Sequence, residues 1–155
     1  MRNRQCTART ALAGLIVALL TGSTLSAAGC MISTQPLVFG RYDVFDPAPT
    51  DTTAKVSYVC NLPVTPPVVR LSAGLSSSFA PREMTSLDDA LRYNVFLDAS
   101  CTTVFGDGTA GTTVFSGAPP AEGVTYEVMV FGRIPARQNV HAGTYSDTLV
   151  LTIEF

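Results

Sequence analysis

The alternation of apolar and polar positions is clearest near the end of the chain. Residues 122–155 contain two long alternating segments, joined by a segment with proline, asparagine and glycine. In the second of them every other residue is apolar, in the order Leu149, Leu151, Ile153 and Phe155. A period of two predicts a β-strand with one buried face. We expect the chain to stop within this strand, which would leave the outer edge of the strand uncovered and able to recruit a partner.

Shorter apolar segments predict further strands. These are residues 37–39, 53–60, 68–71 and 91–97, with two short pieces at 103–105 and 112–115. The buried faces are predicted to be Val56, Tyr58 and Cys60 in one strand, and Leu91, Tyr93, Val95 and Leu97 in another. Asp107 and Gly108 predict a hairpin turn between the two short pieces. Only residues 86–91 resemble a helical turn. About seven short strands separated by turn residues predict one all-β sandwich domain.

The first 28 residues have the composition of an export signal. Arg2, Arg4 and Arg9 precede an apolar stretch at residues 11–20, and small residues follow up to Ala28. This order predicts a signal peptide over residues 1–28 and a mature domain over residues 29–155. The apolar stretch is too short to cross a bilayer as a helix. We therefore expect no bilayer-spanning segment in the mature chain.

The charge of the chain excludes some partners. The formal net charge is −2, and it becomes −5 without the signal, because three arginines and no acid are removed. No cluster of basic residues is visible. A mildly acidic chain of this kind is a poor ligand for nucleic acid or for anionic lipid.

Cysteine usage fits an oxidising compartment but leaves the pairing open. Without Cys6 in the signal, the mature chain holds Cys30, Cys60 and Cys101. One pair and one remaining thiol are expected unless chains crosslink. By loop-closure entropy, joining Cys30 to Cys60 stabilises by about 3.5 kcal/mol, and joining Cys60 to Cys101 by only a few tenths more. The small residues before Cys30 also resemble a lipidation site, and a lipidated Cys30 would leave the other two cysteines to pair.

No pattern of catalytic or metal-binding residues is present. His141, the only histidine, lies in a turn segment and is predicted to face solvent. A hydrolase would need such a base beside an activated nucleophile, and no such motif occurs. The acid clusters are Asp43 with Asp46 and Asp88 with Asp89, and they are interpreted as turn residues. GDGTAG lacks the repeated acids of a calcium loop. We expect no enzyme, metal or cofactor.

Three segments carry a resemblance to a known family. They are CMISTQPLVFGRYD at residues 30–43, LRYNVFLDASCTTVFGDGTAGT at 91–112 and VFGRIPARQNVHAGTYSDTLVLTI at 130–153. Together they resemble the spore coat protein U domain, a family similar to the subunits of archaic chaperone-usher pili, which act in surface attachment and biofilms. The resemblance implies an immunoglobulin-like (pilin-like) sandwich that lacks its last strand. A periplasmic chaperone would hold it, and the N-terminal strand of a neighbouring subunit would complete it after the usher.

The resemblance also implies particular site residues. It pairs Cys30 with Cys60 in a disulfide. The residues expected to flank the acceptor groove are Phe39, Leu149, Leu151, Ile153 and Phe155. A groove that leaves four or five apolar side chains uncovered forgoes on the order of 10 kcal/mol. This is comparable to the stability of a whole domain, so we expect the domain to be unstable alone.

The sequence therefore predicts a non-enzymatic structural or adhesive subunit, assembled at the bacterial surface by donor-strand complementation. Only Gly29 separates the expected cleavage site from Cys30, whereas pilus subunits carry a longer donor segment there. This favours a terminal subunit or a coat protein outside a pilus. The alternative is a self-contained secreted or lipid-anchored module that binds a surface through its loops.

Overall fold

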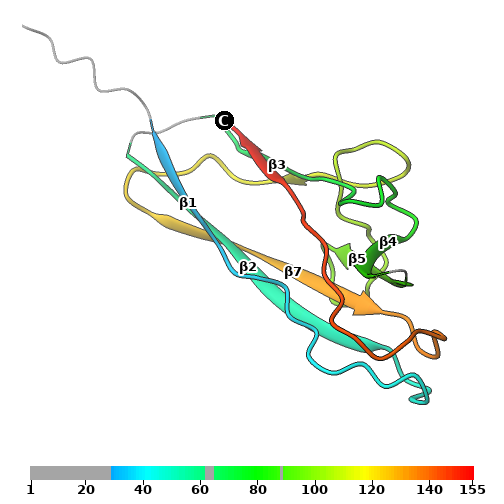
Figure 1. Cartoon of the computed structure of the whole chain (residues 1–155). Coiled ribbons are helices and arrows are strands. Elements are labelled where there is room, and N and C mark those ends of the chain that lie inside the picture. Colours follow the sequence, from blue (N-terminus) through cyan, green and yellow to red (C-terminus); the bar gives the residue numbers. More distant parts are fainter. Residues whose placement is uncertain (1–28, 62–64, 88) are drawn as a thin grey trace, which may run out of the picture.

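The computed structural model describes residues 29–61, 65–87 and 89–155, so the expected signal at residues 1–28 lies outside the described residues. The described residues form eight strands in two antiparallel sheets and no helix (Figure 1). The strands are β1 (Cys30–Thr34), β2 (Thr50–Cys60), β3 (Val68–Leu71), β4 (Arg82–Ser86), β5 (Asp89–Phe96), β6 (Phe115–Ser116), β7 (Thr125–Ile134) and β8 (Leu151–Glu154). One sheet has the order β1-β2-β7-β5-β4, and the other has the order β6-β3-β8. The predicted immunoglobulin-like sandwich is confirmed. No described helix is long and apolar enough to cross a membrane.

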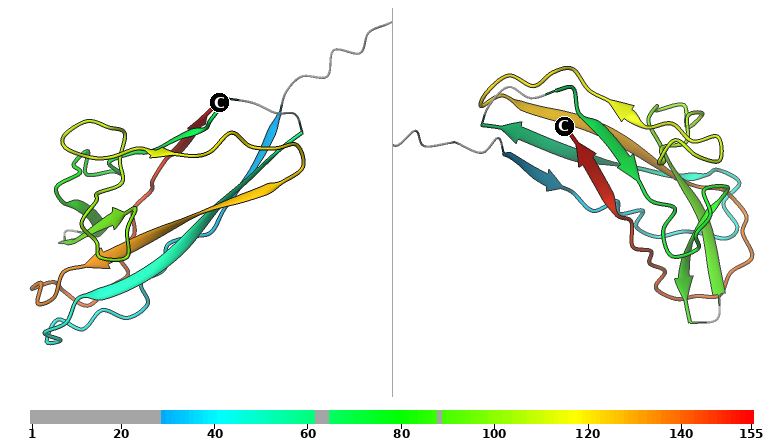
Figure 2. Two further views of the ribbon diagram at one scale, coloured as in Figure 1. Left: turned by 180° about the vertical axis from the view of Figure 1, so that it is seen from behind. Right: turned by 90° about the horizontal axis from the view of Figure 1, so that it is seen from above.

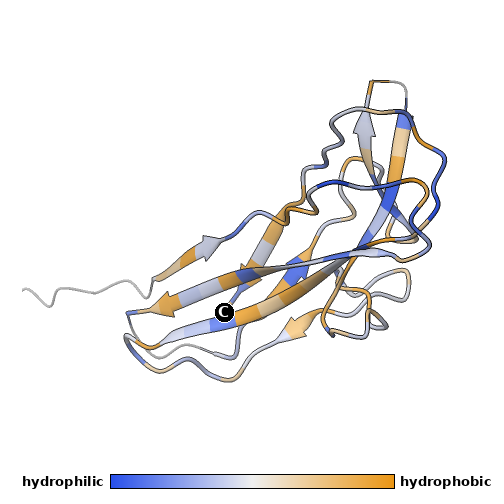
Figure 3. Ribbon diagram, turned by 90° about the horizontal axis from the view of Figure 1, so that it is seen from below, coloured by the Kyte–Doolittle hydropathy of each residue, from blue (hydrophilic) through white to orange (hydrophobic). Residues whose placement is uncertain are grey.

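The longest ladder joins β2 to β7. Their register runs from Thr50 opposite Ile134 to Val59 opposite Thr125. Buried and more exposed positions alternate along both strands, because successive side chains point to opposite faces of a sheet. The hydropathy of the residues follows this alternation only in part, because residues 128–131 of β7 are all apolar (Figure 3). The predicted inner face of β2 is confirmed, since Val56, Tyr58 and Cys60 are buried. This ladder is the base of the larger sheet.

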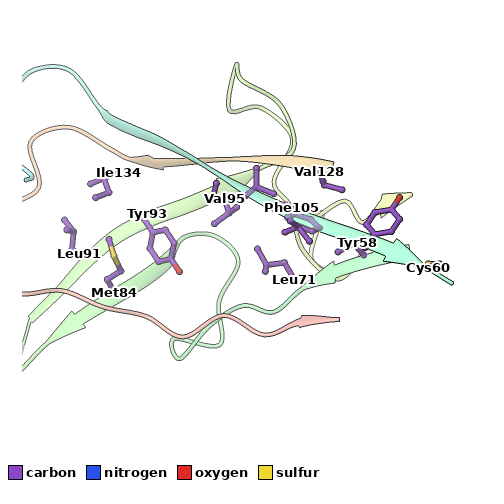
Figure 4. Packing of buried hydrophobic residues seen from close by; sticks show 14 residues of the cluster. Tyr58, Cys60, Leu71, Met84, Leu91, Tyr93, Val95, Phe105, Val128 and Ile134 are labelled. Atoms are coloured by element: carbon purple, nitrogen blue, oxygen red, sulfur yellow. The ribbon is translucent and has the colours of Figure 1, made fainter. Parts of the chain in front are cut away.

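The core lies between the two sheets. Tyr93 and Val95 of β5 face Leu71 of β3, and Phe105 is fully enclosed among them (Figure 4). The predicted strand at residues 68–71 is confirmed. The strand predicted at 91–97 is also confirmed, although it begins at Asp89 and ends at Phe96.

The first strand forms earlier than predicted. Residues 37–39 are not a strand, and β1 pairs with β2 from Cys30 opposite Cys60 to Thr34 opposite Val56 instead. The ladder stops just after Gln35 because Pro36 has no N–H to donate. Leu37 and Phe39 then lie against Gly132 of β7, where an added Cβ would come within 2.6 Å of Leu37.

The helical turn expected at residues 86–91 is wrong. β4 and β5 form an antiparallel hairpin there, with Arg82 opposite Tyr93 and Ser86 opposite Asp89. The alternation of β4 is hidden in the sequence because a buried position holds Arg82 beside buried Met84. A charged residue on the inner face broke the apolar pattern.

The hairpin expected between residues 103–105 and 112–115 is also wrong. Those segments share only an isolated bridge between Phe105 and Thr113. Residues 103–106 instead bond to both sheets: Phe105 N–H donates to Val95 O, and Gly106 O accepts from Leu71 N–H. This segment connects the sheets along one side of the sandwich.

The last two predicted strands lie in different sheets. β7 belongs to the larger sheet and β8 pairs with β3, so they do not form a hairpin (Figure 2). Before β8, Ser146 pairs with Thr85 of β4, and the chain then passes to the smaller sheet. Alternation within β8 is as predicted: Leu151 and Ile153 are half-buried, whereas Thr152 and Glu154 are exposed.

Candidate functional site: an open groove between two edge strands

A groove of about 660 Å³ opens between residues 32–39 and residues 145–151. These two segments lie at one edge of each sheet, on the side where β1 and β8 are outermost. Its floor is made by core residues of both sheets, among them Val56, Leu71, Met84, Tyr93, Val95 and Phe105. Most of these labelled side chains are seen between the sheets in Figure 4. The groove is therefore an opening into the hydrophobic interior. We call it the edge groove.

The β1 wall of the edge groove carries inward-facing residues that remain exposed. Ile32 pairs with Tyr58, and Thr34 pairs with Val56, so both lie on the inner face of the sheet. Tyr58 and Val56 are buried, whereas Ile32 is 47% exposed and Thr34 is exposed. Inner-face positions stay accessible here because, among the described residues, no strand pairs with the far side of β1.

The opposite wall is the chain that leads into β8. Leu149 and Leu151 line the edge groove and are half-buried. Val150 between them points away from the groove and is 62% exposed. Leu149 and Leu151 thus present an apolar surface that faces the β1 wall.

Main-chain groups also point into the edge groove. Along an edge strand, alternate residues direct their N–H and C=O toward the neighbour, and the residues between direct them outward. Gln35 N–H donates to Lys55 O, which places the outward-directed groups of β1 at Ile32 and Thr34. The bond from Ser72 N–H to Val150 O places the outward-directed main-chain groups of the other wall at Leu149 and Leu151. Two strand edges that have no partner within residues 29–61, 65–87 and 89–155 therefore face one apolar opening.

Side chains bound the edge groove at both ends. At one end, Phe155 meets the ring of Tyr58 edge-on, with centroids 6.1 Å apart, and so connects the smaller sheet to the larger. At the other end, the Tyr93 hydroxyl donates to Asp147 Oδ2 over 2.7 Å. Burial and this hydrogen bond raise the pKa of Tyr93, which therefore stays protonated.

The structure places the five residues predicted to flank the groove in two groups. Phe39, Leu149 and Leu151 line it, whereas Ile153 packs on the core and Phe155 lies against Tyr58. Sequence reasoning missed other lining residues: Ile32, Thr34, Leu37 and Tyr145. Ile32 and Thr34 lie in an edge strand whose inner face is open, and Leu37 and Tyr145 lie outside the strands, so no alternation of apolar and polar residues marks them.

A disulfide joins Cys30 to Cys60, the pair that the resemblance implies. It fastens the start of β1 to the end of β2 beside the groove. The bond uses the Cys30 sulfur, so it and the alternative of a lipidated Cys30 exclude each other. Cys101 is a free, half-buried thiol, and burial raises its pKa, which disfavours the reactive thiolate.

The polar residues considered for catalysis or metal binding have structural contacts. Asp43 and Asp46 each accept a main-chain N–H two residues ahead, as expected of turn residues. Asp88 lies outside the described residues. The His141 side chain is 94% exposed, as predicted, and its Nδ1 lies 3.1 Å from Asp89. Across residues 29–61, 65–87 and 89–155, no three His, Cys, Asp or Glu side chains gather as a metal site would require.

Asp89 is more than a solvated turn residue. Its Oδ2 accepts hydrogen bonds from the main-chain N–H of His141 and from the hydroxyl of Tyr145. These bonds, the first above all, lower the pKa of Asp89 to about 2. The carboxylate thereby fastens the start of β5 to the loop that leads to the groove wall.

The fold is pilin-like: an immunoglobulin-like sandwich open along one side. The chain belongs to the Spore Coat Protein U domain family, whose model matches residues 16–152 and confirms the resemblance seen in the sequence. It is 35% identical over 112 residues to Protein U of Myxococcus xanthus, covering 66% of this chain and 59% of that protein.

The fold is also similar to a solved structure. The match is a chain in the crystal structure of the CsuC-CsuE chaperone-tip adhesion subunit pre-assembly complex from archaic chaperone-usher Csu pili of Acinetobacter baumannii. The TM-score is 0.58 at 23% identity, over 83% of this chain and 40% of that chain. At this identity the match shows a shared fold.

Proposed function

We propose that this protein is a non-enzymatic structural subunit of the bacterial surface, pilus-like or spore-coat-like, which accepts a β-strand from another polypeptide in the edge groove. The observation that carries the proposal is that the free edges of two strands face the same apolar opening in the described part of the chain. A strand laid between β1 and β8 would satisfy main-chain groups on both edges and place alternate side chains in the groove.

The physical gain from such an insertion is large. Four or five apolar side chains buried in the groove gain on the order of 10 kcal/mol. Part of this is lost again in ordering the incoming strand. What remains is enough for lasting assembly, which suits a structural role.

The family and the matched complex support the partners that we propose. We propose that the chain is exported by residues 1–28 and that a periplasmic chaperone fills the edge groove before assembly. An usher and a neighbouring subunit then follow, with the strand of that subunit replacing the chaperone. Cleavage after Ala28 would leave only Gly29 before the disulfide, which favours a subunit that accepts a strand at the end of an assembly.

Peptide uptake tests the proposal. A synthetic peptide of about ten residues, apolar at every second position, should fill the groove and raise the melting temperature of the purified protein. A peptide of the same composition with its apolar residues clustered should not. Two neighbouring variants provide the matched control, because Leu149 lines the groove and Val150 points away from it.

Leu149→Asp places an unpaired carboxylate in an apolar site and should weaken peptide binding by about a hundredfold. Val150→Asp should leave the affinity nearly unchanged. Failure of the wild-type protein to take up any alternating peptide would overturn the proposal. Equal losses in the two variants would show that binding occurs elsewhere.

A further inference from the structure

The ladder between β3 and β8 ends in an irregular pair. Leu71 opposite Leu151 is the last regular pair, and Ser72 with Val150 comes next. In a regular antiparallel ladder these two residues would exchange two main-chain hydrogen bonds. Ser72 N–H does donate to Val150 O over 2.9 Å. Val150 N–H, however, donates to the Ser72 hydroxyl over 2.9 Å. A side chain therefore replaces one main-chain partner.

The Ser72 carbonyl is absent from the ladder because Arg82 binds it. Arg82 is fully buried, and its Nε and Nη2 donate to Ser72 O over 3.0 and 2.8 Å. The same guanidinium donates to Phe105 O and to Asn94 Oδ1. A buried cation needs these acceptors, so returning the carbonyl to the ladder would leave its charge less well satisfied. The hydroxyl is what remains to bind Val150.

The use of a hydroxyl in place of a main-chain acceptor sets the direction in which the groove wall points its main-chain groups. With its N–H and C=O both directed toward Ser72, Val150 is in the orientation of a paired residue. Its neighbours Leu149 and Leu151 then direct their main-chain groups the opposite way, into the edge groove. Within the described part of the chain, the Leu149 N–H and C=O make no hydrogen bond. These two main-chain groups are therefore available to pair with an incoming strand.

We propose that Ser72, itself held by Arg82, is the positioning residue of the edge groove. Its hydroxyl fixes Val150, and through Val150 it fixes the main-chain edge with which an incoming strand has to pair. This role rests on the proposed strand-acceptor function, and it explains why β8 can pair with β3 on one side while its other side stays ready for pairing.

Three variants of the full chain test the proposal. Ser72→Ala removes the hydroxyl, and Ser72→Thr keeps one. Ser33→Ala removes a hydroxyl from an exposed, outward-facing position of β1 and is the matched control. The first readout is hydrogen exchange of the Val150 amide without peptide, with the Val130 amide in the core as the measure of global unfolding. The second is the affinity for the alternating peptide.

We expect Ser72→Ala to speed exchange at Val150 about fivefold relative to Val130 and to weaken peptide binding by about fivefold. Ser72→Thr should restore both, and Ser33→Ala should change neither. Unchanged peptide affinity in Ser72→Ala, with or without faster exchange, would overturn the positioning role. If the wild-type protein takes up no peptide, the strand-acceptor function fails. Exchange at Val150 then still decides whether Ser72 holds the edge.

Discussion

The two long sides of the sandwich differ in how the space between the two sheets is closed. On one side, residues 103–106 bond to Val95 of the larger sheet and to Leu71 of the smaller one, and Phe105 fills the space between them. On the other side, no main-chain hydrogen bond joins β1 to β8 in the part of the chain that the structure describes. The interior between the two sides is continuous, because Val95 and Phe105 also form the floor of the edge groove.

The comparison shows what the open side lacks. The closed side needs a segment that bonds to both sheets and places one apolar side chain inside. A strand in the edge groove would repeat that arrangement with a segment from another polypeptide. Under the proposed function, the open side is the place of a segment from another polypeptide rather than a binding pocket for a small molecule.

The largest expected effect comes from removing the disulfide that joins β1 to β2 on the open side. Replacing Cys30 and Cys60 by serine removes a bond that closes a loop with a sequence separation of 30. The free energy of unfolding should fall by about 3.5 kcal/mol, measured by chemical denaturation. Cys101→Ser, which removes the free thiol, is the control and should cost far less. Equal stability of the double variant and the wild type would show that β1 does not depend on the disulfide.

The next effect comes from the closed side. Arg82→Met leaves the half-buried carbonyl of Ser72 and the buried carbonyl of Phe105 without their donor and should cost about 3 kcal/mol of unfolding free energy. Arg92→Met in the same hairpin removes an arginine whose side chain is 65% exposed. That control should cost less than about 0.5 kcal/mol. Similar values for the two variants would show that the hydrogen bonds of Arg82 to the Ser72 and Phe105 carbonyls do not stabilise the fold.

A smaller effect is expected at the end of the groove. Phe155→Ala removes the edge contact with Tyr58 and should cost about 1 kcal/mol of unfolding free energy. The groove should then extend toward the disulfide, so peptides longer by one apolar pair should gain affinity in the variant but not in the wild type. Calorimetric titration with a peptide length series measures this. The same length dependence in both proteins would show that Phe155 does not bound the groove.

The smallest effect is a dependence on pH. The pKa of Asp89 is about 2 in the folded protein and about 4 in an unfolded chain, so its ionisation stabilises the fold above about pH 4. This contribution should be lost as the pH falls from about 4 to 2. Asp89→Asn should therefore melt earlier than the wild type at pH 7, and the difference should shrink across that window. A difference independent of pH would mean that the carboxylate charge is not what holds the loop.

Some of the fold could be predicted from the sequence for a definite reason. β2, β3 and β5 are each covered on one face, so their buried positions alternate and the period of two is visible. β4 was missed because Arg82 on its inner face binds carbonyl groups instead of packing as an apolar residue. β1 was missed because its inner face opens on the groove and carries Thr34 where a closed sandwich would place an apolar residue.

In the candidate site, too, some residues could be predicted from the sequence and others could not. Phe39, Leu149 and Leu151 were placed by resemblance, and the structure puts them in the groove lining. Ser72 could not have been found from the sequence, because its part depends on a carbonyl turned toward a buried guanidinium in another strand. Such a contact has no periodic signal.

The central claim is that a foreign strand closes the open side. Hydrogen exchange at individual amides, with and without the alternating peptide, tests it most directly. The account predicts that the amides of Ile32 on one wall and of Leu149 and Leu151 on the other become protected together when the peptide binds. Protection of only one wall, or of neither while the peptide is bound, would contradict it.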